Sequence, residues 1–223
     1  MRRYPSIRQW TLFGVLLIAV GLLGRSIQAQ DDHGARETFQ IMQLNETMGS
    51  VDPATGAVGL NRTRNELWAR VHVTDLDPGS AFSIWAAIFN RPEGCTTNPA
   101  GPVRCSTTDA AAVPNHAEAS AFNVGGIVTG VDGTANVNIH IRSGAAPEGA
   151  FILFGRGGLM DNGVAPGLRP GNGFGAEVHV VIRSHQGILP GQITAQLSEF
   201  NGGCPPNSCN NVQVATFPSV TDR

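Results

Sequence analysis

The sequence contains no lysine, and all fifteen of its basic side chains are arginine. Without a lysine amine the chain has neither a Schiff-base lysine nor the lysine of a nucleotide-binding P-loop. Tyrosine occurs once, at Tyr4, so the rest of the chain has no phenol for acid–base chemistry. Charged residues make up 14% of the 223 residues, against about 25% in average proteins. Since 41% of the residues are apolar, a folded core is still expected.

Several motifs of catalysis and ligand binding are also missing from the sequence. No Gly-x-Ser-x-Gly motif of a serine hydrolase occurs. The glycine-rich residues 171–175 precede an expected strand rather than a helix, so they offer no helix amides to a phosphate. Asp75 and Asp77 are followed at once by Pro78 and lack the spacing of an EF-hand, which indicates a turn rather than a calcium site. The sequence therefore assigns no catalytic residue.

The first 29 residues predict a signal peptide. Three arginines precede the apolar run over residues 12–24, and an acidic segment follows Ala29. Thirteen helical residues rise only about 20 Å, which is short of the roughly 30 Å hydrocarbon core of a bilayer. We expect cleavage after Ala29. Ile27 is large for its place before that site, so an uncleaved N-terminal anchor is the alternative.

The mature chain is expected to be acidic and to lie in a secreted or periplasmic compartment. Removing residues 1–29 takes away four arginines and leaves 11 against 17 acidic residues, a net charge of −6. An acidic chain is a poor partner for nucleic acid, and none is expected to bind. No membrane span is expected in the mature form.

The four cysteines are expected to form disulfides, because export places them in an oxidising compartment. Three connectivities are possible, and the short separations favour Cys95 with Cys105 and Cys204 with Cys209. Each bond would close a short loop and contribute about 2 to 3 kcal/mol. The spacings do not match a zinc ribbon of four thiolates.

Alternation of apolar and polar residues predicts strands throughout the mature chain. Residues 67–73 alternate and predict a strand with one buried face, while the apolar run 81–89 predicts a central strand. A Pro-Gly turn between these two predicts a hairpin. A second hairpin is predicted from residues 122–129 and 135–142, which flank an Asp-Gly turn. Further short strands are predicted at 38–44, 151–154, 176–183, 193–197 and 212–217.

These patterns predict an all-β fold, a single antiparallel β-sandwich of about nine strands with long Gly- and Pro-rich loops. No window of twelve or more residues shows a capped helical period, although a short helix near residues 109–112 fits the sequence. Residues 90–121 and 155–175 are expected to be loops. The predicted organisation is a signal peptide at 1–29, a tail at 30–37, the sandwich at 38–218 and a tail at 219–223.

Polar side chains share one face of the predicted strand near residue 180. Every second residue from Glu177 to His185 except Val181 is polar, namely Glu177, His179, Arg183 and His185, which favours a solvated outer face with Glu177 and Arg183 paired across strands. His179 and His185 would lie roughly 20 Å apart on an unbroken strand, too far to share one ion.

A metal site is the alternative that uses one histidine from each of three strands. His72, His140 and His179 each lie on the polar face of a predicted strand. If these strands are neighbours, the three imidazoles would suit a copper or zinc ion. If they are not, each is an isolated histidine, and no cofactor is expected.

Trp68 and Trp85 are predicted to have different environments. Trp68 shares an outer face with His72. An exposed indole in this position forms a platform for a sugar or peptide ligand; the alternative is that it covers the edge of the sandwich. Trp85 lies in the apolar run and is predicted to be in the core.

Several blocks of the sequence resemble a family of uncharacterised bacterial secreted proteins. The blocks are TDLDPG at 74–79, WAAIFN at 85–90 with PEGC after it, AEVHVVIRSH at 176–185, and FNGGCPPNSC at 200–209 followed by NVQVA. The resemblance implies a secreted β-sandwich and brings no established activity, so it implies no catalytic residue.

Taken together, we predict a secreted, disulfide-stabilised β-sandwich that binds an extracellular or envelope ligand without catalysing a reaction. The candidate binding residues are Trp68, Glu177, Arg183 and His185. The alternative is a secreted copper or zinc metalloprotein that uses His72, His140 and His179.

Overall fold

The computed structural model describes residues 35–45, 49–110, 112, 114–144, 152–154, 158–160 and 166–220, with side-chain surroundings from residue 56 onward outside 145–165. Contacts divide the chain into residues 1–32 and 33–223, and every described residue lies in the second unit. The predicted signal peptide lies outside the described residues. The strands are β1 (Ala35–Asn45), β2 (Gly49–Arg62), β3 (Glu66–Val73), β4 (Ser80–Phe89), β5 (Ala119–Val128), β6 (Ala135–Arg142), β7 (Ile152–Phe154), β8 (Gly158–Met160), β9 (Glu177–Gly187) and β10 (Asn210–Phe217). The helices are η1 (Pro92–Gly94), α1 (Thr107–Ala110) and α2 (Ile193–Ser198).

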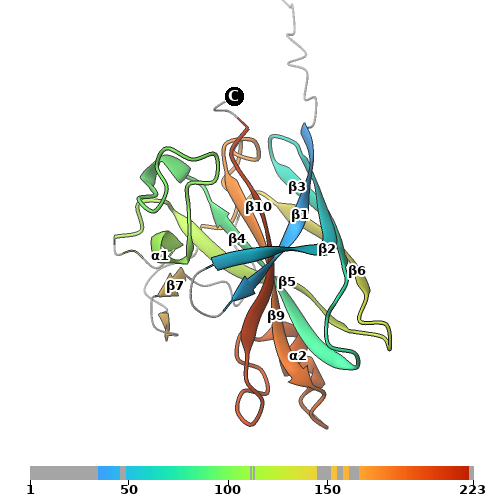
Figure 1. Ribbon diagram of the computed structural model, residues 1–223. Helices are drawn as coiled ribbons and strands as arrows, with labels where there is room; N and C mark the ends of the chain where they lie inside the picture. The colour runs from blue at the N-terminus through green and yellow to red at the C-terminus, as the bar shows by residue number, and fades with distance from the viewer. Residues whose placement is uncertain are drawn as a thin grey trace, which may run out of the picture. The chain divides into compact units, whose positions relative to one another are not determined.

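Eight of the described strands form one antiparallel sheet in the order β5-β4-β9-β10-β1-β2-β3-β6, and β7 pairs with β8 in a small second sheet (Figure 1). The large sheet folds over, so that its edge strands β5 and β6 contact each other. The all-β antiparallel sandwich predicted from the sequence is confirmed. Among the described residues, no helix has the length and apolar character needed to cross a bilayer.

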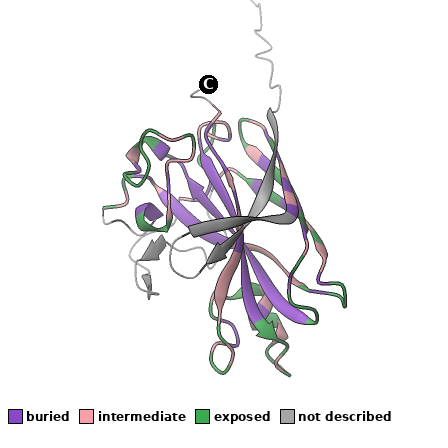
Figure 2. Cartoon of the chain, in the orientation of Figure 1, coloured by how far each residue is buried: buried purple, intermediate pink, exposed green. Residues whose placement is uncertain are grey.

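The two halves of the sheet share one apolar core, and they differ in how their outer faces are covered. Inward side chains from β2, β3 and β6 pack against inward side chains from β4, β5, β9 and β10. In β3 buried and exposed residues alternate, because its outer face is open to solvent. In β4 every residue is buried, and β9 is buried over nearly its whole length (Figure 2). The β4–β9 half therefore has a second cover on its outer side.

Both predicted hairpins are wrong, although their strands and turns are present. β3 pairs with β2 and β6, whereas β4 pairs with β5 and β9. β5 and β6 stand at opposite edges of the sheet. Each turn carries the chain from one layer of the sandwich to the other instead of back along the same layer.

The two crossing turns hold each other in place. The amide of Leu76 donates to the carbonyl of Gly133 (3.2 Å), and the amide of Gly79 donates to the carbonyl of Thr129 (3.2 Å). Gly133 has a φ of +67°, and a Cβ at this position would collide with the carbonyl oxygen of Leu76. Glycine is required there by both the backbone conformation and the close approach.

Four elements differ from the sequence-based predictions. β8 lies within residues 155–175, which were expected to be a loop. β1 begins at Ala35, before the predicted domain boundary at residue 38. β2 was not predicted, since its sequence is rich in glycine and contains Pro53, which lies opposite Met42 at a bulge that tolerates proline. Residues 193–197 form α2 rather than a strand.

Tertiary contacts explain why residues 193–197 are helical. Gln196 is fully buried, accepts a hydrogen bond from the amide of Leu189 (2.9 Å) and donates to the carbonyl of Gly187 (3.0 Å). The helical turn places this amide side chain against the end of β9. A five-residue alternating pattern is too short to outweigh such contacts.

Arg62 joins three parts of the described fold at the end of β2. The side chain is fully buried. One terminal nitrogen donates to the carbonyls of Ala176 (2.6 Å) and Gly173 (3.3 Å), and the other donates to the carbonyls of Pro218 (2.9 Å) and Phe217 (3.2 Å). The guanidinium therefore ties β2 to the start of β9 and the end of β10.

We predict that Arg62→Met destabilises the protein by about 3 kcal/mol or more, because four buried carbonyls lose a charged donor. Urea unfolding of the mature chain measures this as a lower midpoint. Arg70→Met, at an exposed site on β3, is the control and should leave the midpoint nearly unchanged. Equal midpoints for the two variants would contradict this role of Arg62.

Candidate functional site

The open outer face of β3 and β6 carries a ladder of four cross-strand pairs. The register places Glu66 opposite Arg142, Trp68 opposite His140, Arg70 opposite Asn138, and His72 opposite Asn136. All eight side chains point away from the core, because the residues between them are the apolar ones that face inward. We call these eight residues the ladder.

Trp68 and His140 form the aromatic part of the ladder. Trp68 is 36% exposed, and its ring stacks on the ring of His140 with centroids 4.8 Å apart and planes 8° from parallel. Glu66 contacts two side chains of β6. One of its carboxylate oxygens lies 3.7 Å from Nε2 of His140 and 3.5 Å from Nε of Arg142. Trp68 shares the outer face with His72, as the alternation predicts. The indole is thus held in one orientation by an adjoining ring.

The remaining pairs offer hydrogen-bonding groups along the same face. Nδ1 of His72 lies 2.9 Å from the amide oxygen of Asn136. Arg70 and Asn138 are both exposed. A row of amides, imidazoles and a guanidinium next to an indole matches the chemistry of a polar ligand with one apolar face.

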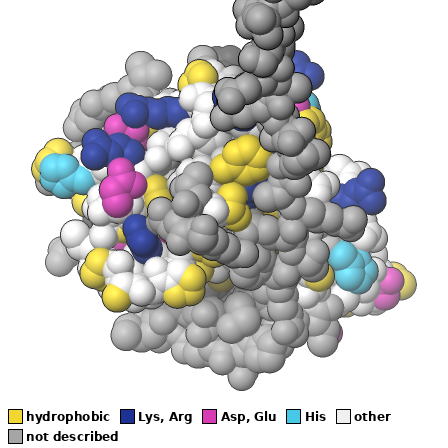
Figure 3. Space-filling view, turned by 90° about the horizontal axis from the view of Figure 1, so that it is seen from above, with side chains coloured by type: hydrophobic (Ala, Val, Ile, Leu, Met, Phe, Trp, Pro, Cys, Tyr) yellow, Lys and Arg dark blue, Asp and Glu magenta, His cyan; other side chains and the backbone are white. Residues whose placement is uncertain are grey.

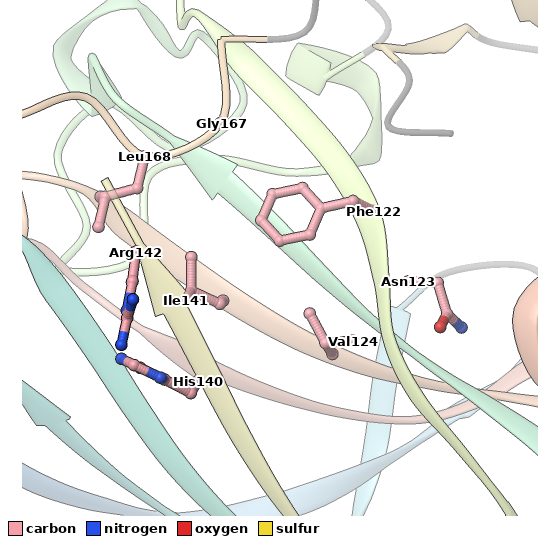
Figure 4. Close-up of a pocket in the computed structure, with 8 residues that line it drawn as sticks. All are labelled: Phe122, Asn123, Val124, His140, Ile141, Arg142, Gly167 and Leu168. Atoms are coloured by element: carbon pink, nitrogen blue, oxygen red, sulfur yellow. The ribbon is translucent and has the colours of Figure 1, made fainter. Parts of the chain in front are cut away.

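A hollow of about 330 Å³ adjoins the ladder where β5 and β6 meet. It is lined by Phe122, Asn123 and Val124 of β5, by His140, Ile141 and Arg142 of β6, and by Gly167 and Leu168. In Figure 4, Phe122, Val124 and Ile141 point into the space between the two strands, and His140 and Arg142 approach each other at one side. The hollow therefore has an apolar interior, and His140 and Arg142 of the ladder form part of its polar rim.

Some charged side chains outside the ladder form pairs of opposite sign. Nε of Arg169 lies 2.8 Å from an oxygen of Glu118, and Nε of Arg91 lies 3.1 Å from an oxygen of Glu93. Figure 3 shows basic and acidic side chains next to one another on the face that it displays. Such neutralised pairs create little long-range attraction for a polyanion.

The polar face of β9 is buried, so the prediction of a solvated outer face is wrong. Glu177 and His185 are fully buried, and His179 and Arg183 are each 8% exposed. The predicted pairing of Glu177 with Arg183 does not occur either. Glu177 instead interacts with the loop that follows β4, and Arg183 with the segment that precedes β10.

The loop between β4 and β5, residues 90–118, is the first covering loop. The Glu177 side chain binds backbone groups of this loop. One carboxylate oxygen accepts from the amide of Arg104 (2.8 Å), and the other accepts from the amide of Cys105 (2.9 Å) and from Nε2 of His179 (2.7 Å). The ring of His179 packs against Phe89, with centroids 5.0 Å apart. Three donors to one carboxylate compensate for its burial.

The first covering loop is closed by the disulfide between Cys95 and Cys105, with a Cα–Cα distance of 5.2 Å. Both sulfurs lie in a small apolar cluster with Ala87 and Phe89 of β4. Asp109 adds further order, because its carboxylate accepts from the amides of Thr96 (2.6 Å) and Ser106 (2.9 Å). Burial alone would raise the pKa of Asp109, but these hydrogen bonds and those of neighbouring hydroxyls lower it below its ordinary value.

Arg183 binds the second covering segment, which runs from residue 188 to residue 209. Its Nε donates to the carbonyl of Phe200 (2.7 Å), and its terminal nitrogens donate to the side chains of Asn211 (3.0 Å) and Asn201 (3.3 Å). The guanidinium carbon also lies 3.9 Å from the centroid of the Phe200 ring. Burial lowers the pKa of Arg183 to about 10, so the side chain remains charged at neutral pH.

His185 is the centre of a buried hydrogen-bond chain. Its Nδ1 lies 2.7 Å from the carbonyl of Gly202 and therefore carries the proton. Its Nε2 accepts from the hydroxyl of Ser83 (2.7 Å), which in turn accepts from the indole nitrogen of Trp85 (2.8 Å). The pKa of His185 is lowered, because burial disfavours the charged ring more than the hydrogen bond to Gly202 favours it. The neutral imidazole satisfies every group in this chain.

Ser83 and His185 have the contact of a nucleophile and its base, but both are fully buried. A substrate cannot reach a serine hydroxyl that lies between a strand and its cover. The arrangement is therefore explained by the satisfaction of buried polar groups. Trp85 is buried as predicted, but it packs against Phe200 on the outer side of β4 and not in the main core.

Both predicted disulfides are present, since Cys204 also bonds to Cys209 with a Cα–Cα distance of 5.9 Å. Sγ of Cys209 lies 3.1 Å from Nδ1 of His185. His185, Cys204 and Cys209 are the described residues whose potential metal-ligand atoms come together, all within 4.8 Å of one another.

The structure does not bring His72, His140 and His179 together. His72 and His140 lie on the adjacent strands β3 and β6 but in different cross-strand pairs. His179 lies on β9, which pairs with β4 and β10 in the other half of the sheet. The strand order therefore does not meet the condition on which the three-histidine copper or zinc site depended.

The expected binding residues do not form one surface. Trp68 is exposed on β3, whereas Glu177, Arg183 and His185 are enclosed on β9. The partners of Trp68 on β6 and the hollow beside them were not predicted as a site. Period-two alternation in residues 135–142 places Asn136, Asn138 and His140 on one face, and this was the available signal.

We predict that Glu177→Gln loosens the first covering loop, because the neutral side chain offers one acceptor where the carboxylate offers two. Hydrogen exchange of the mature chain should be faster at the amides of Arg104 and Cys105, and unfolding should be easier by about 2 kcal/mol. Glu93→Gln is the control, since the Glu93 side chain is 59% exposed. Unchanged protection at both amides would refute this anchoring role.

Comparison of the chain with models of known protein families, with curated proteins and with solved structures finds no match. Function is therefore inferred from the geometry of the described residues.

Proposed function

We propose that this protein is a secreted, disulfide-stabilised binding protein that recognises a saccharide of the extracellular space or the cell envelope through the ladder on β3 and β6. The observation that carries the proposal is the exposed Trp68 ring, held by its stack on His140 within a row of hydrogen-bonding side chains. The apolar face of a sugar ring packs well on an indole, and its hydroxyls match the neighbouring amides and guanidinium.

The ladder is rigid before a ligand arrives. Its side chains stand on two hydrogen-bonded strands whose inner faces are packed in the main core. Contacts within the ladder also restrict Trp68, His140 and Glu66. Less side-chain freedom is lost on binding at such a surface, which favours affinity from a small contact area.

The disulfides and the predicted signal peptide support the same compartment. Two disulfides join all four cysteines. Disulfides of this kind persist where the surroundings are oxidising, as outside the cell or in a periplasm. This agrees with the resemblance to secreted bacterial proteins that the sequence blocks indicate.

A pull-down with insoluble polysaccharides and purified peptidoglycan tests the proposal, using the mature chain without a histidine tag. We expect the wild type to be retained by at least one of these, and Trp68→Ala to bind about tenfold or more weakly, since it removes the stacking surface. Ile188→Ala, which alters an exposed apolar side chain outside the ladder, is the control and should bind like wild type. Equal retention of wild type and Trp68→Ala, or no retention of the wild type, would refute the proposal.

A further inference from the structure

His185 of β9 lies against the disulfide between Cys204 and Cys209, and we call these three residues the corner. The corner is in the β4–β9 half of the sandwich, whereas the ladder is on β3 and β6. We propose that reduction of the Cys204–Cys209 disulfide converts this corner into a three-ligand site for a thiophilic metal ion, Zn(II) or Cu(I). The ligands would be the two sulfurs and Nδ1 of His185, which lie within 4.8 Å of one another. Thiolate and imidazole ligands select these ions over hard cations.

The two disulfides have different surroundings, and only one has the features of such a site. Cys95 is 3% exposed and Cys105 is 6% exposed, within an apolar cluster. Cys204 and Cys209 are only partly buried, and Cys209 touches an imidazole. A thiol reductant therefore has access to the second disulfide and is hindered at the first.

The reduction requires an external dithiol, which supplies two electrons and two protons. One thiolate of the dithiol attacks Sγ of Cys204, so that a mixed disulfide forms and Cys209 leaves as a thiolate. The second thiolate of the dithiol then closes the reductant's own disulfide and releases Cys204. Cys209 is favoured as the leaving group, because Nδ1–H of His185, which donates to the carbonyl of Gly202, also lies 3.1 Å from its sulfur and shares its proton with the thiolate.

The geometry of the corner suits an ion after a small movement. Zinc bonds of about 2.3 Å to sulfur and 2.0 to 2.1 Å to nitrogen put tetrahedral ligand atoms about 3.5 Å to 3.8 Å apart. The two sulfurs, once released from each other, therefore separate by a small shift of the loop between them. Zn(II) would replace the two thiol protons and leave a fourth position for water.

The buried chain behind His185 supports the ring in the required orientation. A metal at Nδ1 requires the proton on Nε2, which then donates to the hydroxyl oxygen of Ser83 across the same 2.7 Å contact. Hydrogen bonding of the far ring nitrogen is the usual way that a metal-binding histidine is oriented.

The experiment compares the oxidised mature chain with the chain after mild reduction by a dithiol and anaerobic removal of the dithiol. Mass spectrometry of alkylated peptides should find Cys204 and Cys209 free and Cys95 still bonded to Cys105. Zinc titration against a chromophoric chelator should then show one ion per reduced chain, bound more tightly than about 10 µM, and none in the oxidised chain. Co(II) should give sulfur-to-cobalt charge-transfer absorption, and a Cu(I) titration shows which ion is preferred.

Variants of the ligands identify the site. Cys209→Ser and His185→Gln should each weaken zinc binding to the reduced chain by about tenfold or more. Should His185→Gln not fold, Ser83→Ala, which leaves all three ligands in place, should weaken binding and alter the cobalt spectrum. The double variant Cys95→Ser and Cys105→Ser and the exposed-site variant His116→Gln are controls that should retain wild-type affinity.

Three results would overturn the proposal. The first is stoichiometric zinc in the oxidised chain. The second is a reduced chain that binds none of Zn(II), Co(II) or Cu(I). The third is wild-type affinity in Cys209→Ser. None of these results bears on Trp68, so they leave the saccharide proposal to its own test.

Discussion

The outer face of β9 imposes the constraint on which much of the fold depends. Glu177, His179, Arg183 and His185 lie on a strand that is covered on both sides. Burying a polar or charged group without partners costs several kcal/mol, so each of these side chains needs hydrogen bonds where water has been removed. The partners are largely backbone groups of the two covering segments. The conformation of those segments is therefore set by the strand that they cover.

Each covering segment combines the same three elements. A polar residue of β9 binds the backbone of the segment, and a short disulfide closes a loop within the segment. Apolar side chains of the segment pack on β4. Long segments without regular structure normally have too few contacts to remain ordered. Here the disulfides reduce the freedom of the unfolded chain, while the contacts with β9 select one arrangement in the folded chain. Arg62 performs a similar role near the start of β9, where it binds four carbonyls.

The two covering segments lie over the outer side of β4 and β9, whereas the outer face of β3 and β6 is open to solvent. The strands beneath the ladder, β3 and β6, are packed from behind by the shared core and have no cover in front. Recognition on a sheet face depends on side chains at fixed cross-strand spacing. The hollow between β5 and β6 extends this face toward apolar side chains of the core edge, such as Phe122 and Ile141.

Local patterns in the sequence were sufficient for some features and insufficient for others. Period-two alternation in β3 and β6 predicted both strands and the residues that share their outer faces, and the short separations between cysteines indicated both disulfides. Alternation in β9 also predicted which residues share a face. It could not show whether solvent or a loop lies against that face, because the covering loops are distant in the sequence. Turn residues such as Gly133 predicted a reversal of direction but not the layer that the next strand joins.

The two disulfides illustrate why distant contacts matter for chemistry as well as for fold. Both close short loops, and the spacing of their cysteines alone gives no reason to treat them differently. In the fold, Cys105 lies against alanines and Phe89, and its sulfur contacts the carbonyl oxygen of Pro92, an acceptor that does not stabilise a thiolate. Cys209 lies against His185, whose ring is held by Ser83 and the carbonyl of Gly202. Because thiolate chemistry follows the nearest donor, the same residue type is expected to be inert at one site and reactive at the other.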